Sequence, residues 1–288
     1  MDSNQAKSGY PKLDISRLSS QITQVGWLEP LIFEQVTSTN DIAIANLEQI
    51  NSAHGIVVVA DEQTAGRGRL DRSWVAPAGS GIAMSLGVKM QSFAVELSAV
   101  PLICGLAVNR ALKSFGITSY LKWPNDIVFS NTDIFPSIDL SEQGTVTDGF
   151  NKKAETDLRK AGGVLVQLVQ DSLIIGIGLN VTLKSHDLPV PHATSLHLEG
   201  FEVDRIELIC KVLEEINFLQ GSDISWLAEY SKNCVTLGKT VSVTNFSNQT
   251  VTGLAQEVLP TGALLLKNLE NFYQITVGDI VHLAVESS

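Results

Sequence analysis

The segment QTAGRGRLDRSW, residues 63–74, combines three arginines with two glycines. Guanidinium groups form paired hydrogen bonds with phosphate and carboxylate oxygens. Gly66 and Gly68 allow a close backbone approach to a ligand and positive φ. Arginine-rich segments are most often solvated turns that pair with surface acids, but two predicted buried strands flank this one. We therefore predict a loop that holds an anion at the rim of a sheet.

Neither of two glycine-containing segments matches an established phosphate-binding motif. In a dinucleotide-binding fingerprint, a small residue and a helix would follow the glycine pair, whereas Asp71 stands at that position. LGKT, residues 237–240, has Asn233 where the first glycine of a phosphate loop belongs. The arginines themselves are therefore the candidate anion ligands.

Three other polar segments stand at predicted strand ends. In KWPND, residues 122–126, Asp126 is a candidate ligand for Mg²⁺ held with nucleotide phosphates, although such a sequence also forms purely structural turns. Lys160 leads through two glycines onto an apolar strand and, taken alone, is expected at the surface. Asn180 ends a second apolar strand, where it either caps a turn or binds a polar ligand edge. The histidines form no metal-binding pattern, and no nucleophilic serine motif occurs.

The overall charge limits the partners of the chain. Its 288 residues carry a formal net charge of −11, which argues against nonspecific binding to nucleic acid or to an anionic membrane, since both need a clustered basic face. The three cysteines are far apart and indicate neither disulfides nor a zinc site. No segment has the apolar pattern of a signal peptide or a membrane span. We expect a cytoplasmic protein.

Apolar patterning predicts two parts, as the length also suggests. Residues 1–30 are expected to be an N-terminal extension with a short helix, and residues 130–159 an inserted mobile loop. From about residue 233, five short period-two strands indicate a small barrel. Before it, strands are predicted near 31–37, 54–60, 81–90, 119–129 and, as a hairpin turning near Asp171, 162–181. Helices are predicted after residues 38–40, at 95–115, near Trp226, and at 204–220 with Phe218 on the buried face.

Taken in order, these segments resemble the biotin protein ligases, or biotin–[acetyl-CoA-carboxylase] ligases. The series TSTN, QTAGRGRLDRSW, KWPND, KAGGVLV, GIGLN and ATSL, followed by a small β domain, matches that family over roughly residues 31–286. The resemblance implies an α+β fold, with a mixed-sheet catalytic domain at 31–232 of the type shared with class II aminoacyl-tRNA synthetases. A C-terminal SH3-like barrel is implied at 233–288. The implied class is monofunctional, without a DNA-binding domain.

The implied activity has two steps and uses biotin, ATP and Mg²⁺. Biotin and ATP first give biotinyl-5′-AMP and pyrophosphate. The biotinyl group then passes to one lysine of the biotin carrier domain of acetyl-CoA carboxylase or a related carboxylase. Because the reacting carboxylate and phosphate are both anionic, such a site needs arginine, lysine and metal charge. A homodimer is an option in this family, whereas nucleic acid and membrane partners are not expected.

The resemblance also implies roles for individual residues. Arg69, Lys160 and Asp126 match catalytic positions, with Asp126 as the candidate Mg²⁺ ligand. The implied biotin-binding residues are Ser38, Thr39, Asn40, Gln63, Gly66, Arg67 and Lys160. The implied ATP-binding residues are Arg67, Arg69, Arg72, Trp74, Lys122 and Asn180.

Two departures from the family pattern qualify the match. Residues 127–159 separate KWPND from Lys160, where the family usually has only a few residues, so the insertion must loop out. Gln167 stands where a glutamate is common. One alternative is a lipoate or octanoate ligase, but the arginine pair, triple glycine and histidine–aspartate of those enzymes do not occur here. The other is a non-catalytic biotin-binding protein, against which the intact catalytic positions argue.

Overall fold

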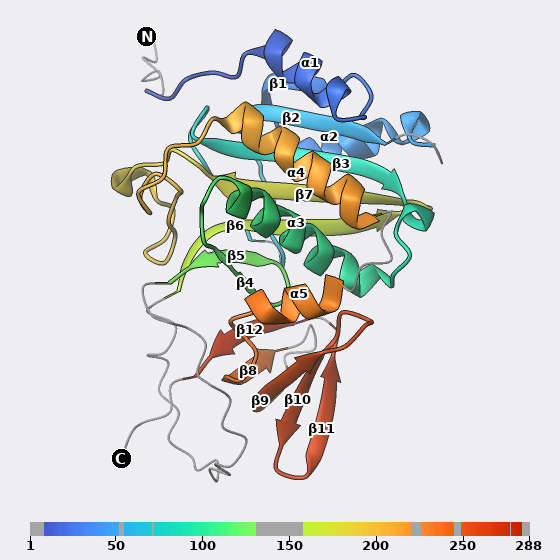
Figure 1. The fold of residues 1–288 in the computed structure, drawn as a ribbon, viewed down its shortest axis with the longest axis vertical. Coiled ribbons are helices and arrows are strands. Elements are labelled where there is room, and N and C mark those ends of the chain that lie inside the picture. The colour runs from blue at the N-terminus through green and yellow to red at the C-terminus, as the bar shows by residue number, and fades with distance from the viewer. Residues whose placement is uncertain are drawn as a thin grey trace.

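The computed structural model describes residues 9–51, 55–70, 72–130, 158–220, 226–244, 249–276 and 278–283. Figure 1 shows a seven-stranded mixed sheet with the order β1-β2-β3-β7-β6-β5-β4 beside a smaller five-stranded sheet. The α+β class is therefore confirmed. The strands of the larger sheet are β1 (Leu31–Val36), β2 (Ile56–Gln63), β3 (Gly81–Lys89), β4 (Tyr120–Lys122), β5 (Asp126–Phe129), β6 (Arg159–Val169) and β7 (Ser172–Asn180).

The centre of the larger sheet is the predicted hairpin. β6 and β7 pair antiparallel from Gly162↔Leu179 to Val169↔Ser172, so the turn falls at residues 170 and 171 as expected. β1 and β2 are parallel, whereas the other neighbouring strands are antiparallel. Central strands covered on both faces read as continuous apolar runs, which explains the β-branched segment of β2.

Helices cover both faces of this sheet. α3 (Val100–Ser114) and α4 (Arg205–Gln220) lie side by side across one face and share its main core (Figure 1). α2 (Thr39–Ala45) covers the other face, where Ala43 packs with Val58 and Ile174. Within the described residues, none of the helices combines the length and apolarity that a membrane crossing requires.

The buried face of α4 differs from the prediction at one residue. Phe218 is 48% exposed, whereas Leu219 is 5% exposed. Successive residues of a helix are rotated by about 100°, so Leu219 continues the buried stripe of Val212 and Ile216, and Phe218 does not. The Phe218 ring instead lies under the Arg110 guanidinium, 5.0 Å from its centroid.

The N-terminal extension belongs to the main core. Its expected short helix is α1 (Ile15–Gln24), capped by the Asp14 side chain, and it buries Leu18 and Ile22 completely. The sequence suggested a weakly patterned extension because α1 has only three apolar residues, of which Ile15 is 52% exposed. The N-terminal extension is therefore packed onto the same core as the larger sheet.

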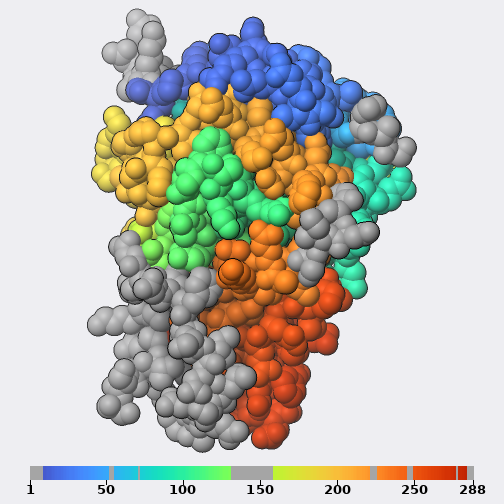
Figure 2. All heavy atoms as spheres, viewed as in Figure 1, coloured from blue at the N-terminus to red at the C-terminus, as the bar shows by residue number. Residues whose placement is uncertain are grey.

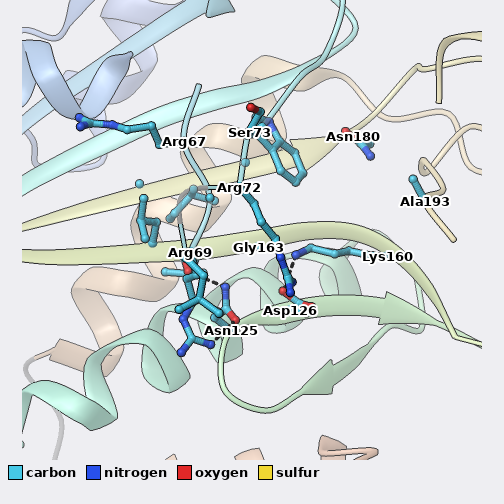
Figure 3. Close-up of a pocket in the computed structure, with 18 of the residues that line it drawn as sticks. Arg67, Arg69, Arg72, Ser73, Asn125, Asp126, Lys160, Gly163, Asn180 and Ala193 are labelled. Carbon is cyan, nitrogen blue, oxygen red and sulfur yellow. Dashed lines mark hydrogen bonds and ion pairs between the residues drawn. The ribbon is translucent and has the colours of Figure 1, made fainter. Parts of the chain in front are cut away.

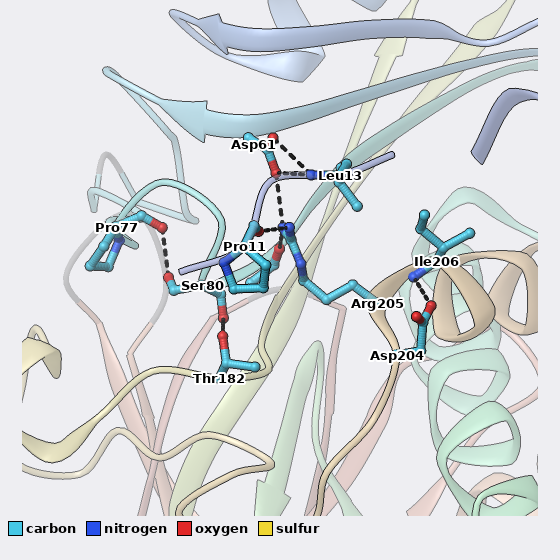
Figure 4. A network of polar contacts seen from close by, with 10 residues as sticks. Pro11, Leu13, Asp61, Pro77, Ser80, Thr182, Asp204, Arg205 and Ile206 are labelled. Atoms are coloured by element: carbon cyan, nitrogen blue, oxygen red, sulfur yellow. Dashed lines mark hydrogen bonds and ion pairs between the residues drawn. The ribbon is translucent and has the colours of Figure 1, made fainter. Parts of the chain in front are cut away.

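A buried ion pair fastens the chain before α1 to the sheet (Figure 4). Arg205 Nη1 lies 3.0 Å from Asp61 Oδ1, and the two side chains are 7% and 8% exposed. The Arg205 guanidinium also donates to the carbonyls of Pro11 and Gly81, and the Leu13 amide donates to Asp61. Buried charges need such paired and hydrogen-bonded surroundings. This network joins α4, β2, β3 and the N-terminal segment.

The C-terminal part is a five-stranded antiparallel sheet in the order β11-β10-β9-β8-β12, consistent with the SH3-like type. α5 (Trp226–Asn233) leads into it, and the Val235 amide donates to the Leu121 carbonyl of β4. Figure 2 shows the two parts packed against each other. The strands are β8 (Thr240–Thr244), β9 (Thr250–Val258), β10 (Leu264–Asn268), β11 (Asn271–Ile275) and β12 (Asp279–His282).

The predicted insertion lies mostly outside the described residues. Its described ends are adjacent, because Phe129 of β5 pairs with Arg159 of β6. β6 begins at Arg159, so the strand takes up the last residue of the expected 130–159 loop. The chain can therefore leave and re-enter the sheet here without separating β5 from β6.

Candidate active site

A cavity of about 810 Å³ lies between the larger sheet and the loop that follows β2 (Figure 3). This volume falls in the range of small-molecule binding sites. Gly66 does not line the cavity, although the sequence placed it among the binding residues. The predicted residues that do line it are Ser38, Thr39, Asn40, Gln63, Arg67, Arg69, Arg72, Trp74, Lys122, Asp126, Lys160 and Asn180.

A neutral polar corner forms where β1 leads into α2. Ser38, Thr39 and Asn40 are 2%, 3% and 4% exposed. The Thr39 amide donates to Gln63 Oε1 over 2.8 Å. Since β1 and β2 are parallel and Val36 is opposite Gln63, the carboxyl ends of both strands meet here. That topology brings the TSTN segment and the start of the arginine loop together.

Two residues that the sequence analysis did not place in the site hold this corner. Ser85 Oγ on β3 lies 2.6 Å from both Thr39 Oγ1 and Asn40 Oδ1. Asn40 Nδ2 donates to Gln167 Oε1 over 2.8 Å. The uncharged Gln167 side chain therefore accepts a hydrogen bond from Asn40 and orients the Asn40 amide. The sequence signal for Ser85 was a single polar residue inside the apolar run of β3.

The arginine loop folds back on itself as a narrow turn. Arg67 bridges to Ser73, and the Trp74 amide donates to the Gly66 carbonyl over 2.9 Å. A Cβ on Gly66 would lie 2.4 Å from the Trp74 carbonyl oxygen, so only glycine fits there. Neither Gly66 nor Gly68 uses the positive φ that glycine allows, whereas Leu70 has the left-handed backbone, with φ 54°. Gly66 thus acts through close packing within the loop.

Trp74 closes the loop against the sheet. A Cβ on Gly178 of β7 would come within 2.6 Å of the Trp74 indole. Gly178, the second glycine of the GIGLN segment, therefore leaves the space that the Trp74 ring occupies. This contact fixes the end of the arginine loop over the central strands.

The outer two arginines of the loop pair with carboxylates. Arg67 forms an ion pair with Asp41 of α2, and Arg72 forms one with Asp279 of β12. The Arg67 and Arg72 side chains are 45% and 64% exposed, and such solvent-exposed pairs contribute at most about 1 kcal/mol. Both guanidinium groups can therefore exchange these partners for other anions.

Arg69 is partly buried and is the least exposed arginine of the loop. Its guanidinium donates to Asn125 Oδ1 over 3.2 Å (Figure 3). It also donates to the Gly278 carbonyl over 3.2 Å. Burial lowers the pKa of Arg69, while the charges of Asp126 and Asp279 act in the opposite direction. The side chain links the arginine loop, the KWPND turn and the C-terminal part. It therefore has the least freedom of the three arginines.

Lys160 and Asp126 form the charged centre of the cavity. Lys160 Nζ lies 2.5 Å from Asp126 Oδ1, and the side chains are 32% and 23% exposed. The pairing of β5 with β6 places Asp126 opposite Gly163 and Val128 opposite Lys160. Lys160 is thus a cavity residue, contrary to the surface position that its local sequence suggests. The insertion leaves the two strands paired, as the family pattern required.

Asn180 carries an acceptor without a partner among the described atoms. Its Nδ2 donates to the Thr194 carbonyl over 2.9 Å, whereas its buried Oδ1 has no hydrogen-bond partner in the part of the chain that the structure describes. Buried polar atoms are rarely left unpaired unless a ligand or water completes them. Because Asn180 lines the cavity, a donor group of a ligand can satisfy this oxygen.

Two further segments line the cavity, although the sequence named no site residue in them. Pro189, Val190, His192 and Ala193 line the wall beside Lys160, whose amide donates to the His192 carbonyl over 2.8 Å. Ala193 begins the ATSL segment of the family pattern. Residues 279–281 of β12 bring the C-terminal part into the wall, and only the packing of distant elements places them here.

The cavity fits a metal ion that is shared with phosphate groups. The described residues contain no cluster of three metal-binding side chains. Mg²⁺ typically keeps several waters and binds one or two carboxylates together with substrate phosphates. Asp126 supplies such a carboxylate, and it contacts Lys160 through Oδ1. The donor set therefore suits a phosphate-bound Mg²⁺ and does not suit an all-protein metal site.

Comparisons with known proteins agree with this geometry. The model of the biotin/lipoate A/B protein ligase family matches residues 32–181. The biotin–[acetyl-CoA-carboxylase] ligase of Mycobacterium tuberculosis is 30% identical, over 95% of this chain and 97% of that protein. The bifunctional ligase/repressor of Bacillus spizizenii is 33% identical, over 64% of this chain and 51% of that protein. The biotin protein ligase of Aquifex aeolicus, solved with biotin and ATP, superposes with a TM-score of 0.67 at 28% identity, covering 89% of this chain and 99% of that one.

Proposed function

The chain belongs to the biotin/lipoate A/B protein ligase family, and we propose that it is a biotin protein ligase acting in two steps. Biotin and ATP form biotinyl-5′-AMP and pyrophosphate in the cavity. The biotinyl group then passes to a lysine of a biotin carrier domain, that of acetyl-CoA carboxylase or a related carboxylase. The observation that carries the proposal is the joint lining of one cavity by a neutral polar corner and a separate cationic centre.

The neutral corner suits the ureido ring of biotin. Ser38, Thr39, Asn40 and Gln63 offer hydroxyls and amides, which match a neutral ring with both donors and acceptors. The hydrogen bonds from Ser85 and Gln167 hold Asn40 before a ligand arrives. Preorganised polar groups of this kind lose little freedom on binding. Biotin bound here directs its carboxylate toward the charged centre.

The charged centre suits the junction between the biotin carboxylate and the α-phosphate of ATP. Two anions must approach each other there, and Lys160 and Arg69 supply positive charge to both. Arg67 extends this charge toward the biotin side of the loop. Asp126 holds Lys160 in place and would ligate Mg²⁺ together with the phosphates. When bound, Mg²⁺ supplies charge neutralisation at the phosphates.

The remaining cavity residues suit the nucleotide. Arg72 and Lys122 are cations at the phosphate end, and Trp74 closes the loop above the site. The unpaired Oδ1 of Asn180 accepts a hydrogen bond from the adenylate. All four side chains line the same cavity, from the arginine loop, from β4 and from the end of β7, which supports this placement.

The second step needs no nucleophile from the enzyme. The mixed anhydride of biotinyl-5′-AMP is already activated, and the amine of the carrier lysine attacks its carbonyl carbon while AMP leaves. Lys160 and Arg69 stabilise the charge that develops on the carbonyl and phosphate oxygens. The arginine loop covers the intermediate and limits its hydrolysis by water.

The decisive experiment compares three acids in one assay. ATP-dependent pyrophosphate release is measured with biotin, lipoate and octanoate in parallel, and a biotin carrier domain is then added and probed with streptavidin. Release with biotin alone and labelling of the carrier are expected. Release with lipoate or octanoate would instead assign the chain to the sister ligases. Biotin binding without any release would indicate a non-catalytic biotin-binding protein.

A further inference from the structure

The KWPND turn is anchored by a buried polar chain that begins in the catalytic part and ends in the C-terminal sheet. The Trp123 amide donates to Thr236 Oγ1 over 3.1 Å, and Thr236 Oγ1 lies 3.2 Å from His282 Nε2. The three residues are 1%, 0% and 4% exposed. None of them was singled out by the sequence as a site residue.

The groups involved define the direction of the first of these hydrogen bonds. A backbone amide can only donate, so the Thr236 oxygen accepts from Trp123. Thr236 Oγ1 and His282 Nε2 share the second bond, in which the donor depends on the imidazole tautomer. Burial lowers the pKa of His282 to about 3, with a further contribution from Lys122 and Lys239. The imidazole is therefore uncharged at neutral pH, and no buried positive charge opposes this contact.

A second bond reinforces the same anchor. Trp123 Nε1 donates to the Gly262 carbonyl over 3.0 Å, so both nitrogen atoms of Trp123 are bound by the C-terminal part. The next residues of the turn then face the cavity. Asn125 Oδ1 accepts from Arg69, and Asp126 pairs with Lys160. A shift of Trp123 would move these groups together.

We propose that Thr236 and His282 are positioning residues for the ATP half of the active site. Through Trp123 they set the backbone of the turn that carries Lys122, Asn125 and Asp126 into the cavity. The inference rests on the proposed ligase function. The biotin corner is held separately, by Gln63, Ser85 and Gln167 within the larger sheet. Loss of the Thr236 or His282 contact should therefore impair the use of ATP more than the binding of biotin.

The test is a comparison of Thr236→Val with Thr236→Ser. Valine removes the hydroxyl, and a displacement of catalytic groups by less than an ångström can lower rates by about tenfold or more. Thr236→Val should raise the KM for ATP and lower kcat/KM for ATP by about tenfold. Biotin affinity, measured by calorimetry without ATP, should change less than twofold. Thr236→Ser should restore the wild-type values, because serine keeps the hydroxyl.

Matched variants separate positioning from general destabilisation. Thr252→Val removes a threonine hydroxyl of β9 that bonds to Ser242 within the C-terminal sheet, and it should leave both substrates unaffected. If Thr236→Val does not fold, His282→Phe keeps a ring but removes the nitrogen that bonds to Thr236, and a loss for ATP without a loss for biotin is again expected. Equal losses for ATP and biotin, or no change in either variant, would overturn the inference. A wild-type protein that releases no pyrophosphate would instead overturn the ligase function itself.

Discussion

Acidification from pH 7.5 to pH 5 should destabilise the folded protein through one buried imidazole. His282 faces Thr236, with Lys122 and Lys239 as nearby charges. Burial, together with these lysines, lowers the pKa of His282 from 6.5 to about 3. In the unfolded chain the same side chain regains its ordinary pKa. Between the two values, only the unfolded state binds the proton.

The sign and size of the effect follow from proton linkage. Where the unfolded state binds one more proton, the free energy of unfolding falls by about 1.4 kcal/mol for each unit decrease in pH. The loss starts near pH 6.5 and ends near pH 3, the folded-state value. At pH 5, His282 should therefore cost about 2 kcal/mol relative to pH 7.5. That is a measurable share of a typical stability of about 5–15 kcal/mol.

Urea unfolding of the wild type and of His282→Phe at pH 7.5, 6.5, 5.8 and 5 measures this contribution. Carboxylates titrate in both proteins, so only the difference between the two profiles belongs to the histidine. The wild type should lose about 2 kcal/mol more than the variant over this interval. His186→Gln is the control, because the His186 side chain is 74% exposed and should give the wild-type profile. Parallel profiles for wild type and His282→Phe would refute a buried neutral imidazole.

Three other substitutions test separate parts of the structure. Lys160→Met should reduce biotin-dependent pyrophosphate release at least about 100-fold, as expected for loss of a charge-stabilising group, and near-normal release would exclude that role. Arg205→Met should lower the free energy of unfolding in urea by about 3–5 kcal/mol, because it leaves the Asp61 carboxylate buried without its cation; a loss below 1 kcal/mol would contradict the buried pair. Asp279→Asn should lower the KM for ATP by up to about fivefold, since Arg72 loses an exposed competitor worth at most about 1 kcal/mol, whereas a raised KM would show that Asp279 assists binding.

The parts of the site that sequence alone located are those whose geometry is local or follows from strand pairing. The β6–β7 hairpin was predictable because its apolar runs and turn are contiguous. Lys160 and Asp126 could be paired only by assuming that the insertion loops out, since the lysine itself has no distinctive neighbours. The antiparallel pairing of β5 with β6 meets that assumption. Local apolar pattern and strand pairing were therefore sufficient to predict the β6–β7 hairpin and the proximity of Lys160 to Asp126.

The remaining features depend on contacts between distant elements, which sequence patterns do not encode. Gln167 was visible as a departure from the family, but its bond to Asn40 depends on how α2 packs over the sheet. Phe218 is a different case, because the spacing of Val212, Ile216 and Leu219 already favours Leu219 for the buried face of the helix, and Phe218 lies about 100° away from it. The bonds from the C-terminal sheet to Trp123 cross more than a hundred positions of the chain. No local signal marks Thr236 or His282 as relevant to the cavity.

The arrangement of the arginines explains how a strongly acidic chain can present an anion site. Arg67 and Arg72 are paired with exposed carboxylates, so their charge is balanced within the protein. Phosphate and carboxylate groups of the substrates must compete with Asp41 and Asp279 for these arginines. The net gain in binding free energy is the difference between the arginine–substrate pair and the arginine–aspartate pair that it replaces. Arg69 has carbonyl partners and, among the described residues, no direct carboxylate pair, so its charge is not balanced by an ion pair of the kind that Arg67 and Arg72 form. Selectivity for the reacting groups should therefore depend mainly on Arg69 and Lys160, while the outer arginines adjust how readily the loop exchanges protein carboxylates for substrate anions.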